Sequence, residues 1–327
     1  MGISRFDVEL DNPSKTYENG SVLSGKIYLD LDSPKPVKGI KLTVFGEAEI
    51  SWTQTTSALE AKDVYPAECD RETYIDDDEN YILGKDGPVV IPTGNHVYPF
   101  TYKLPEAIPA SFDEELGKIE YKVKVTIQRA WYLWNHRESV KFDVFVPLDL
   151  NTDHKAAEPA RHEISKKFMG CSEPVDLSVS LPVRGYIPGQ TIPITVDIKN
   201  GAEVEIKGVY FTLIKLYTYH GPTKPRLDEQ VIGHHDTQLP KNGQQESSIQ
   251  HFLQIPEVPP SYQRHSKLID LEYLIRVEVR VDEMHKNFEI DVPIIIGSVA
   301  LLASTVAMAN GNSNMHQNND QVPAKCD

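Results

Sequence analysis

The sequence has few cysteines and few cations, and each shortage removes a class of protein. Its three cysteines, Cys69, Cys171 and Cys326, are an odd number, lie far apart and form no C-x-x-C pair. This spacing argues against a disulfide framework and against a zinc site, and it favours a reducing compartment. Only 33 Lys and Arg stand against 48 Asp and Glu, and the resulting formal charge of −15 disfavours nucleic acid as a partner.

Signatures of enzymes are missing as well. The sequence contains no G-x-S-x-G, H-E-x-x-H, P-loop or G-x-G-x-x-G motif. The neighbours His234 and His235 would face opposite sides of a strand, so they would not converge on one metal ion. The carboxylates of Asp113, Glu114 and Glu115 fit a solvated loop better than an acid/base pair. We therefore predict no enzyme activity, no metal site and no cofactor.

Long apolar runs are also rare. The N-terminus lacks the apolar region of a signal peptide, and Phe6 stands where a myristoylation pattern needs Ser or Thr. Residues 292–309 carry no charge, but they reach only the lower limit of membrane-spanning length and include Pro293 and Gly297. We interpret them as a last strand followed by a loose tail. The sequence thus predicts a cytoplasmic protein that is peripheral to membranes.

Strand-like alternation is what the chain does contain. Apolar and polar residues alternate with a period of two in residues 3–10, 22–31, 38–52, 121–127 and 142–146. Turn residues separate these stretches, and no apolar pattern of helical period and length is found in either half. The pattern predicts an all-β protein built from antiparallel β-sandwiches. Residues 53–95, which include an acidic run at 76–79, are expected to form a solvated insert between strands.

The second half of the sequence repeats the first. Tyr186 and Gly189 fall on Tyr17 and Gly20 at an offset of 169. Further echoes keep the same order: Lys207-Gly208-Val209 on Lys38-Gly39-Ile40, Ile255-Pro256-Glu257 with Pro259 and Ser261 on Leu104-Pro105-Glu106 with Pro109 and Ser111, residues 271–277 on 119–125, and Phe288 with Val292-Pro293 on Phe142 with Val146-Pro147. A repeat of this length indicates two similar domains in tandem.

The repeat sets the expected domain boundaries. We predict one β-sandwich over residues 1–150, a short linker over 151–172 and a second β-sandwich over 173–300. Each domain is long enough to bury a core of its own. The last residues, 301–327, are rich in Asn and Gln and poor in apolar side chains, so a disordered tail is expected.

One short motif offers a candidate binding site. Pro259, Pro260, Ser261 and Tyr262 match the P-P-x-Y pattern that WW domains bind as a polyproline II segment. The repeat pairs Pro259, Ser261 and Tyr262 with Pro109, Ser111 and Phe112, and a feature present in both halves fits a structural turn with the aromatic ring packed inward. Both interpretations stay open, and the structural turn is preferred.

These residues together resemble the arrestin superfamily, and specifically its arrestin domain-containing proteins, the α-arrestins. The resemblance covers roughly residues 3–300 and rests on the following residues: Tyr17-Glu18-Asn19-Gly20, Gly25, Val44-Phe45-Gly46-Glu47-Ala48, Trp52, Gly94-Asn95-His96-Val97-Tyr98-Pro99-Phe100, Leu104-Pro105, Ile108-Pro109, Ser111-Phe112, Gly117, Tyr121, Arg129-Ala130-Trp131, Gly185-Tyr186-Ile187-Pro188-Gly189-Gln190, Asn200, Pro259-Pro260-Ser261, Tyr273 and Pro293-Ile294-Ile295-Ile296-Gly297. It implies two sandwiches joined by a short linker.

The resemblance also implies a function. It suggests a non-catalytic adaptor that binds cytosolic tails of membrane proteins, is recruited to the plasma membrane or endosomes, and directs endocytosis, ubiquitylation or endosomal sorting. Related proteins recruit WW-domain HECT ubiquitin ligases through P-P-x-Y motifs in a C-terminal tail, whereas residues 301–327 contain none. A phosphate-binding surface is not expected either, because residues 1–150 hold 16 Lys and Arg against 26 Asp and Glu, a net charge of −10.

Two other functions remain open on sequence grounds. A sorting-coat subunit of the retromer type would share this fold but would belong to a stable stoichiometric complex. An enzyme or a carbohydrate-binding sandwich is the third hypothesis, because a fold does not fix a function.

Overall fold

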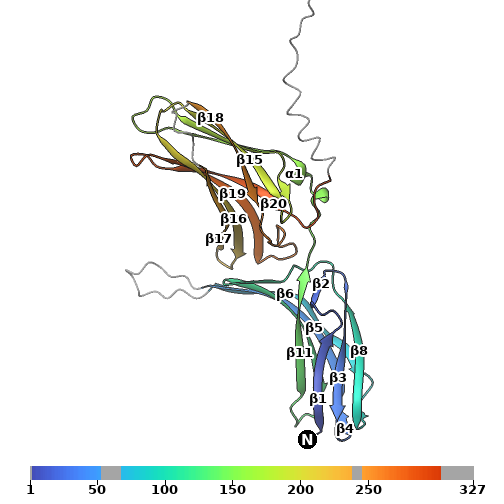
Figure 1. The fold of residues 1–327 in the computed structure, drawn as a ribbon. Helices are drawn as coiled ribbons and strands as arrows, with labels where there is room; N and C mark the ends of the chain where they lie inside the picture. The colour runs from blue at the N-terminus through green and yellow to red at the C-terminus, as the bar shows by residue number, and fades with distance from the viewer. Residues whose placement is uncertain (1, 53–67, 238–244, 303–327) are drawn as a thin grey trace, which may run out of the picture. The chain divides into compact units, whose positions relative to one another are not determined.

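The chain forms twenty strands and two very short helices within the residues that the computed structural model describes, 2–52, 68–237 and 245–302. The helices are η1 (Leu150–Thr152) and α1 (His154–Ala157). The described residues fall into two compact units, the first built on residues 2–146 and the second on 147–217, 228–262 and 271–302, with 218–227 and 263–270 grouped with the first. The all-β prediction is confirmed (Figure 1).

The first unit contains two main sheets and a small one. The three-stranded sheet has the spatial order β1 (Ile3–Leu10), β3 (Val22–Leu31) and β8 (Gly94–Lys103). The six-stranded sheet has the order β2 (Thr16–Glu18), β11 (His136–Phe145), β10 (Gly117–Gln128), β5 (Gly39–Trp52) and β6 (Glu68–Leu83), with β9 (Phe112–Glu114) beside β10. The small sheet pairs β4 (Lys35–Val37) with β7 (Val89–Ile91). The two-residue period explains the layering, since alternate side chains of β10 are buried along its whole length. Most pairs are antiparallel, but β2 runs parallel to β11.

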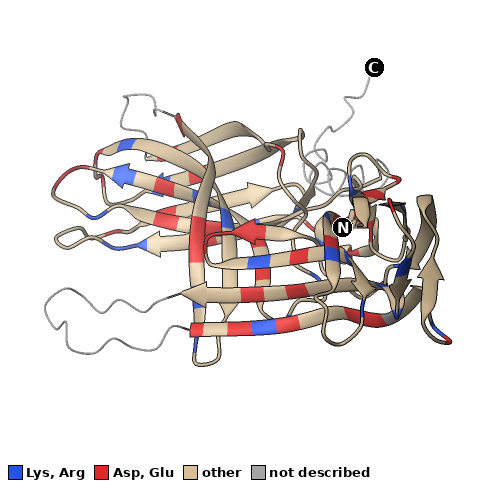
Figure 2. Cartoon of the chain, turned by 90° about the horizontal axis from the view of Figure 1, so that it is seen from below, with Lys and Arg blue, Asp and Glu red and all other residues tan. Residues whose placement is uncertain are grey.

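Strand β6 corrects the expectation of a solvated insert over residues 53–95. Residues 53–67 lie outside the described part of the chain, but Asp76, Asp77 and Asp78 lie inside β6, which pairs with β5. Acidic residues recur along both strands (Figure 2). Aspartate is a poor strand former, yet β6 is an edge strand with a solvated face, where charged side chains are tolerated. Pairing with the long strand β5 therefore outweighs the local preference.

The second unit repeats this plan with two sheets. Their strands are β12 (Ala160–Lys166), β13 (Val175–Leu181), β15 (Thr191–Asn200) and β18 (Glu246–Gln254); and β14 (Gly185–Tyr186), β20 (Phe288–Ile296), β19 (Ile269–Val281), β16 (Ile206–His220) and β17 (Pro225–Thr237). Here too a short strand, β14, runs parallel to the last strand, β20. Strand β12 occupies residues 160–166 of the segment that we expected to be an inter-domain linker.

A tyrosine marks the equivalent corner in each unit. The Tyr121 hydroxyl donates to the carbonyl of Pro109 over 2.7 Å, and the Tyr273 hydroxyl donates to the carbonyl of Pro259 over 2.8 Å. Both rings are buried, and burial raises the pKa of both phenols. The predicted equivalence of residues 119–125 with 271–277 is therefore confirmed at the level of hydrogen bonds.

The proposed match of Phe142 with Phe288 is wrong. Tyr121 lies opposite Phe142 in the β10–β11 pair, whereas Tyr273 lies opposite Ile294 in the β19–β20 pair. The structural equivalent of Phe142 is thus Ile294, six positions beyond Phe288. The Val-Pro dipeptides that suggested the match do not occupy equivalent positions, because strand register follows backbone pairing rather than residue identity.

Residues 292–309 begin in a strand, since β20 continues to Ile296. Within the part of the chain that is described, none of the helices has the length and apolar character needed to cross a bilayer. From residue 303 on, the expected tail lies outside the described residues.

Candidate interaction surfaces

The predicted WW-domain motif lies at the tyrosine corner of the second unit. The Pro259 carbonyl accepts the Tyr273 hydroxyl, as described above. The Ser261 amide donates to the Ile296 carbonyl over 2.7 Å, and the Ile296 amide donates to the Ser261 hydroxyl over 2.8 Å. In the first unit Ser111 makes the same reciprocal pair with Val144, at 2.8 and 2.9 Å. The same two bonds thus hold the corner against the last strand in both units.

Tyr262 is packed and has a left-handed backbone. Its φ is 65°, and its amide donates to the Leu271 carbonyl over 2.6 Å. The half-buried side chain packs against a cluster formed by Leu148, Leu150, Ala156 and Ile295, together with Ile187 and Leu301. A WW ligand needs an accessible polyproline II segment, in which φ is near −75°. The folded segment does not have that conformation, so its placement favours the structural turn.

Replacing Tyr262 with alanine separates the two interpretations. We expect the free energy of unfolding to fall by about 2 kcal/mol, because a half-buried ring is lost from an apolar cluster. Pro260→Ala is the matched control, since it disrupts a WW-binding motif but leaves the packed ring and the described hydrogen bonds in place. Chemical denaturation and pull-down with a WW-domain ligase measure the two effects. Loss of ligase binding in both variants at unchanged stability would support the ligand instead.

A second surface is a hollow on the outer face of the four-stranded sheet. Its volume is about 780 Å3, and it is lined by residues 161 and 163–165 of β12, 176–178 of β13, 197–199 of β15 and 246–248 of β18. Strand alternation buries Leu177 and Ile198 in the core and leaves the polar residues between them on this face. Ser165 lies opposite Asp176, and Asp197 lies opposite both Ser178 and Ser248.

The lining of the hollow is acidic, and the lining residues form only some of their possible hydrogen bonds and ion pairs with one another. The Ser248 hydroxyl donates to an Asp197 carboxylate oxygen over 2.6 Å, whereas the buried Ser178 hydroxyl oxygen has no hydrogen-bond partner among the residues that the structure describes. Two ion pairs lie among the lining residues, Arg161–Glu163 at 2.7 Å and Lys199–Glu246 at 3.7 Å. Four carboxylates against two cations give the lining residues a net charge of −2. The hollow therefore suits a polar segment that carries positive charge.

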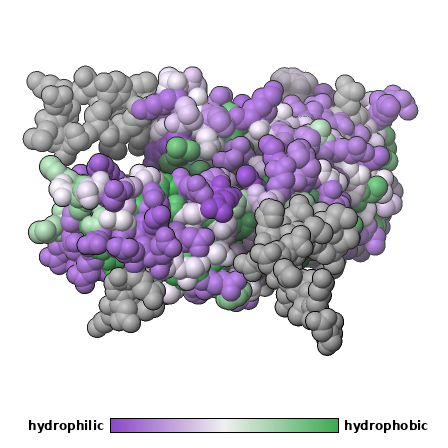
Figure 3. All heavy atoms as spheres, turned by 90° about the horizontal axis from the view of Figure 1, so that it is seen from above, coloured by the Kyte–Doolittle hydropathy of each residue, from purple (hydrophilic) through white to green (hydrophobic). Residues whose placement is uncertain are grey.

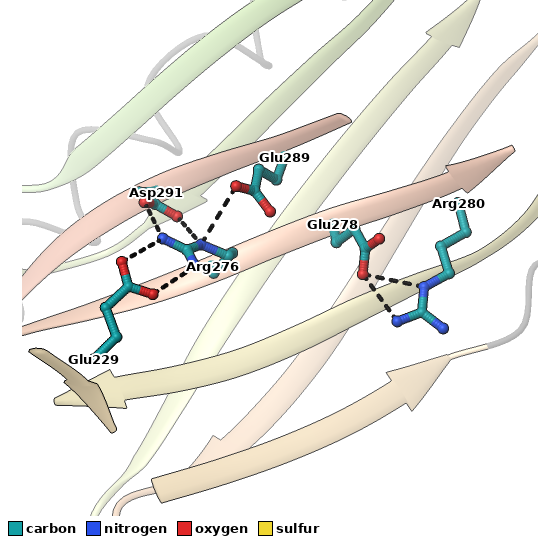
Figure 4. Close-up of polar contacts among 6 residues, drawn as sticks. All are labelled: Glu229, Arg276, Glu278, Arg280, Glu289 and Asp291. Carbon is teal, nitrogen blue, oxygen red and sulfur yellow. Dashed lines mark hydrogen bonds and ion pairs between the residues drawn. The ribbon is translucent and has the colours of Figure 1, made fainter. Parts of the chain in front are cut away.

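Arg276 is the centre of a charged cluster on the other sheet of the second unit (Figure 4). Its guanidinium makes bidentate contacts with Asp291 of β20, at 2.8 and 2.9 Å, and with Glu229 of β17, at 2.9 and 3.2 Å; Glu289 lies 3.7 Å away. Hydrogen bonds to Asp291 and Glu229 raise the pKa of Arg276. Nearby Arg280 pairs with Glu278 at 3.0 Å and stacks on the Tyr210 ring at 3.7 Å. Bidentate contacts from one guanidinium to carboxylates on two other strands hold the three strands together.

The remaining predicted residues are separated by the fold. His234 contacts Tyr210 and Thr212, whereas His235 contacts His251 of the opposite sheet, so the two imidazoles face different sides as expected. Among the described residues, no three His, Cys, Asp or Glu side chains are grouped to hold a metal ion. Asp113 and Glu114 lie in β9 rather than in a loop. Cys69 is exposed, Cys171 is partly exposed, and Cys326 lies outside the described residues.

Sequence reasoning missed the hollow and the Arg276 cluster. The signals were there: Asp176, Ser178 and Ser180 alternate with buried apolar residues, as Arg276, Glu278 and Arg280 do. Such alternation shows which residues share a face, but it does not show their neighbours across strands. On the face seen in Figure 3, hydrophilic residues cover most of the surface and hydrophobic residues are scattered in small groups.

Comparison with known proteins agrees with this architecture. Residues 6–151 match the family described as "Arrestin (or S-antigen), N-terminal domain", and residues 171–301 match "Arrestin (or S-antigen), C-terminal domain". The chain is 26% identical to arrestin domain-containing protein 17 of Caenorhabditis elegans, over 92% of this chain and 72% of that protein. It is 24% identical to arrestin domain-containing protein 1 of Rattus norvegicus, over 91% and 65%, and of Homo sapiens, over 94% and 68%.

These matches place both halves of the chain in one family. The tandem sandwiches with equivalent tyrosine corners are a pair of arrestin domains. The chain belongs to the arrestin superfamily, a family of adaptors, and within it to the α-arrestins. The alignments span only about two thirds of the length of the mammalian relatives.

Proposed function

We propose that this protein is a non-catalytic adaptor that binds cytosolic segments of membrane proteins and directs their endocytosis, ubiquitylation or endosomal sorting. The observation that carries the proposal is the acidic hollow on the β12–β13–β15–β18 sheet, in a chain that belongs to an adaptor family. The protein would act in the cytoplasm and at the plasma membrane or endosomes, where such segments are exposed.

Charge connects the hollow to this class of partner. Cytosolic loops of membrane proteins carry an excess of Lys and Arg close to the membrane. Asp176, Asp197, Glu163 and Glu246 line the hollow and offer these side chains carboxylate partners. The edge strands β12 and β18 border the hollow and leave one row of backbone groups for an extended segment.

Charge reversal tests the hollow directly. We expect Asp176→Lys with Asp197→Lys to weaken binding of a Lys- and Arg-rich juxtamembrane peptide at least tenfold, because attraction becomes repulsion. Asp228→Lys with Asp236→Lys, on exposed positions of β17, makes the same charge change on the other sheet. Titration calorimetry at two salt concentrations measures the affinities. Equal loss in both double variants would contradict a specific role for the hollow.

Affinity purification from detergent extracts tests the adaptor function as a whole. Integral membrane proteins should be enriched with the wild-type chain and depleted with the hollow variant. Recovery of soluble enzymes alone would contradict the proposal. A stable stoichiometric complex in size-exclusion chromatography would favour a sorting-coat subunit instead.

A further inference from the structure

Four large apolar residues are exposed together on the turn between β10 and β11. Trp131 is 89% exposed, Tyr132 69%, Leu133 40% and Trp134 92%. We call residues 131–134 the aromatic loop. Exposed tryptophans cost solvation free energy and usually mark an interaction site. The proposed adaptor function was argued without these residues, and neither the hollow nor the tyrosine corner includes them.

The loop holds its aromatic residues outward on an ordered turn. The Leu133 amide donates to the Ala130 carbonyl over 2.8 Å, which closes a four-residue turn. The Arg129 amide donates to the Asn135 side-chain oxygen over 2.9 Å, and the Arg129 guanidinium donates to the Trp134 carbonyl over 3.4 Å. The rings of Trp131 and Tyr132 stack edge to face, 5.7 Å apart. These bonds keep the side chains from folding back onto the sheet.

Cations lie beside the loop in a domain whose net charge is negative. A small hollow beside it is lined by Lys38, Arg129, Trp131 and Leu133 with three uncharged residues, and no carboxylate lines it. Lys35, Lys38 and Arg129 form no ion pair with any residue that the structure describes. Burial and the charge of Arg129 lower the pKa of Lys35, which is consistent with uncompensated positive charge. Three cations without a carboxylate partner in the described part of the chain therefore lie near the aromatic loop, although residues 1–150 carry −10.

We propose that the aromatic loop is a membrane-docking site that inserts Trp131 and Trp134 into the interface of an anionic lipid bilayer. Trp and Tyr are enriched at the level of lipid headgroups, where an apolar ring and a polar N–H or O–H are both satisfied. Lys35, Lys38 and Arg129 would meet anionic headgroups, which attract basic residues within a Debye length. Apolar insertion and electrostatic attraction to anionic lipids both strengthen peripheral membrane binding.

A bilayer fits this loop better than a protein partner does. Stable protein interfaces bury large, complementary areas around a central pocket. The aromatic loop offers a few protruding side chains on one turn, whereas a lipid interface demands no shape complementarity. The inference goes beyond the proposed function, because it concerns lipid rather than cargo. Its test does not depend on the acidic hollow.

Vesicle binding of the full chain tests the proposal. We expect sedimentation with vesicles of phosphatidylcholine and phosphatidylserine, with weaker binding to phosphatidylcholine alone. Trp131→Ser with Trp134→Ser should reduce the partition coefficient at least tenfold. Lys35→Gln with Lys38→Glu should remove the preference for phosphatidylserine. Met169→Ser with Met284→Ser, which changes two equally exposed apolar residues elsewhere, should leave binding unchanged. Melting temperatures verify that each variant is folded.

Tryptophan fluorescence distinguishes insertion from surface attachment. The chain has three tryptophans, and Trp52 is only 5% exposed, so a blue shift on vesicle addition reports on Trp131 and Trp134. Quenching by brominated lipids should follow the same dependence on phosphatidylserine. The proposal is overturned if the wild-type chain does not bind these vesicles, if the double tryptophan variant binds as well as wild type, or if the loop variant loses only a soluble protein partner.

Discussion

Gly46→Ala is expected to destabilise the first domain by about 3 kcal/mol, because the added methyl group has no room. Gly46 lies on β5 directly opposite Tyr121 of β10, and a Cβ atom built on Gly46 would overlap the Tyr121 ring. That ring is fully buried, and its hydroxyl holds the Pro109 corner, so it cannot move without breaking the hydrogen bond. The strain therefore falls on the centre of the sandwich. Chemical denaturation of the first domain's transition measures the loss.

Gly208→Ala provides the matched control. Gly208 is also buried in a strand, but an added Cβ would meet its nearest neighbours, Tyr210 and Thr237, at 3.4 and 3.5 Å, which is ordinary contact. We expect a change of less than about 1 kcal/mol there. Gly46→Ala should cost less in a Tyr121→Leu background than in the wild-type protein, because the smaller side chain relieves the overlap. Similar stability of the Gly46 and Gly208 variants would contradict the packing described for Tyr121.

Arg276→Ala is expected to destabilise the second domain by about 2 kcal/mol, between the values typical of exposed and of buried ion pairs. The guanidinium, 23% exposed, is the cation in contact with Asp291, Glu229 and Glu289, which come from two other strands. Its removal leaves three neighbouring carboxylates, 39–54% exposed, without this cation, and their mutual repulsion, reduced by solvent, lowers stability. Glu229→Gln with Asp291→Asn in the same background should restore part of the stability. Thermal and chemical denaturation measure both effects.

Arg280→Ala is the control for this cluster. Arg280 is 43% exposed, pairs with one carboxylate, that of Glu278, and stacks on Tyr210. Exposed pairs of this kind contribute less than about 1 kcal/mol. Added salt should reduce the loss in the Arg276 variant, since screening weakens repulsion between carboxylates. A loss at Arg276 no larger than that at Arg280 would show that the cluster is not structural.

The duplicated fold was predictable because its strongest signals are local. Tyr121 and Tyr273 stand in similar runs, and Pro109 and Pro259 precede them at nearly the same distance; the structure connects each pair with one hydrogen bond. Burial at every second residue then gives both the strands and their inner faces. The family resemblance rested on the same residues, and the comparisons confirm it.

The structural features that could not be predicted from the sequence depend on pairing between strands. Asp76, Asp77 and Asp78 have little intrinsic preference for a strand, and only the partner strand β5 places them in one. The Phe142–Phe288 match failed because identical dipeptides do not fix register, whereas the hydrogen bonds to β10 and β19 do. The acidic hollow requires four strands to lie in the order β12-β13-β15-β18, and nothing local to Asp176 or Asp197 reveals that order.

Site-specific photo-crosslinking in cells tests the central claim most directly. A photoreactive residue at Ser165, an exposed position that lines the acidic hollow, should crosslink to cytosolic segments of integral membrane proteins. The same residue at Ser139, an exposed position on β11, serves as the control. The account predicts that mass spectrometry identifies Lys- and Arg-rich juxtamembrane peptides at Ser165 and that Asp176→Lys with Asp197→Lys removes them. Crosslinks to soluble proteins alone, or equal yields at the two positions, would contradict it.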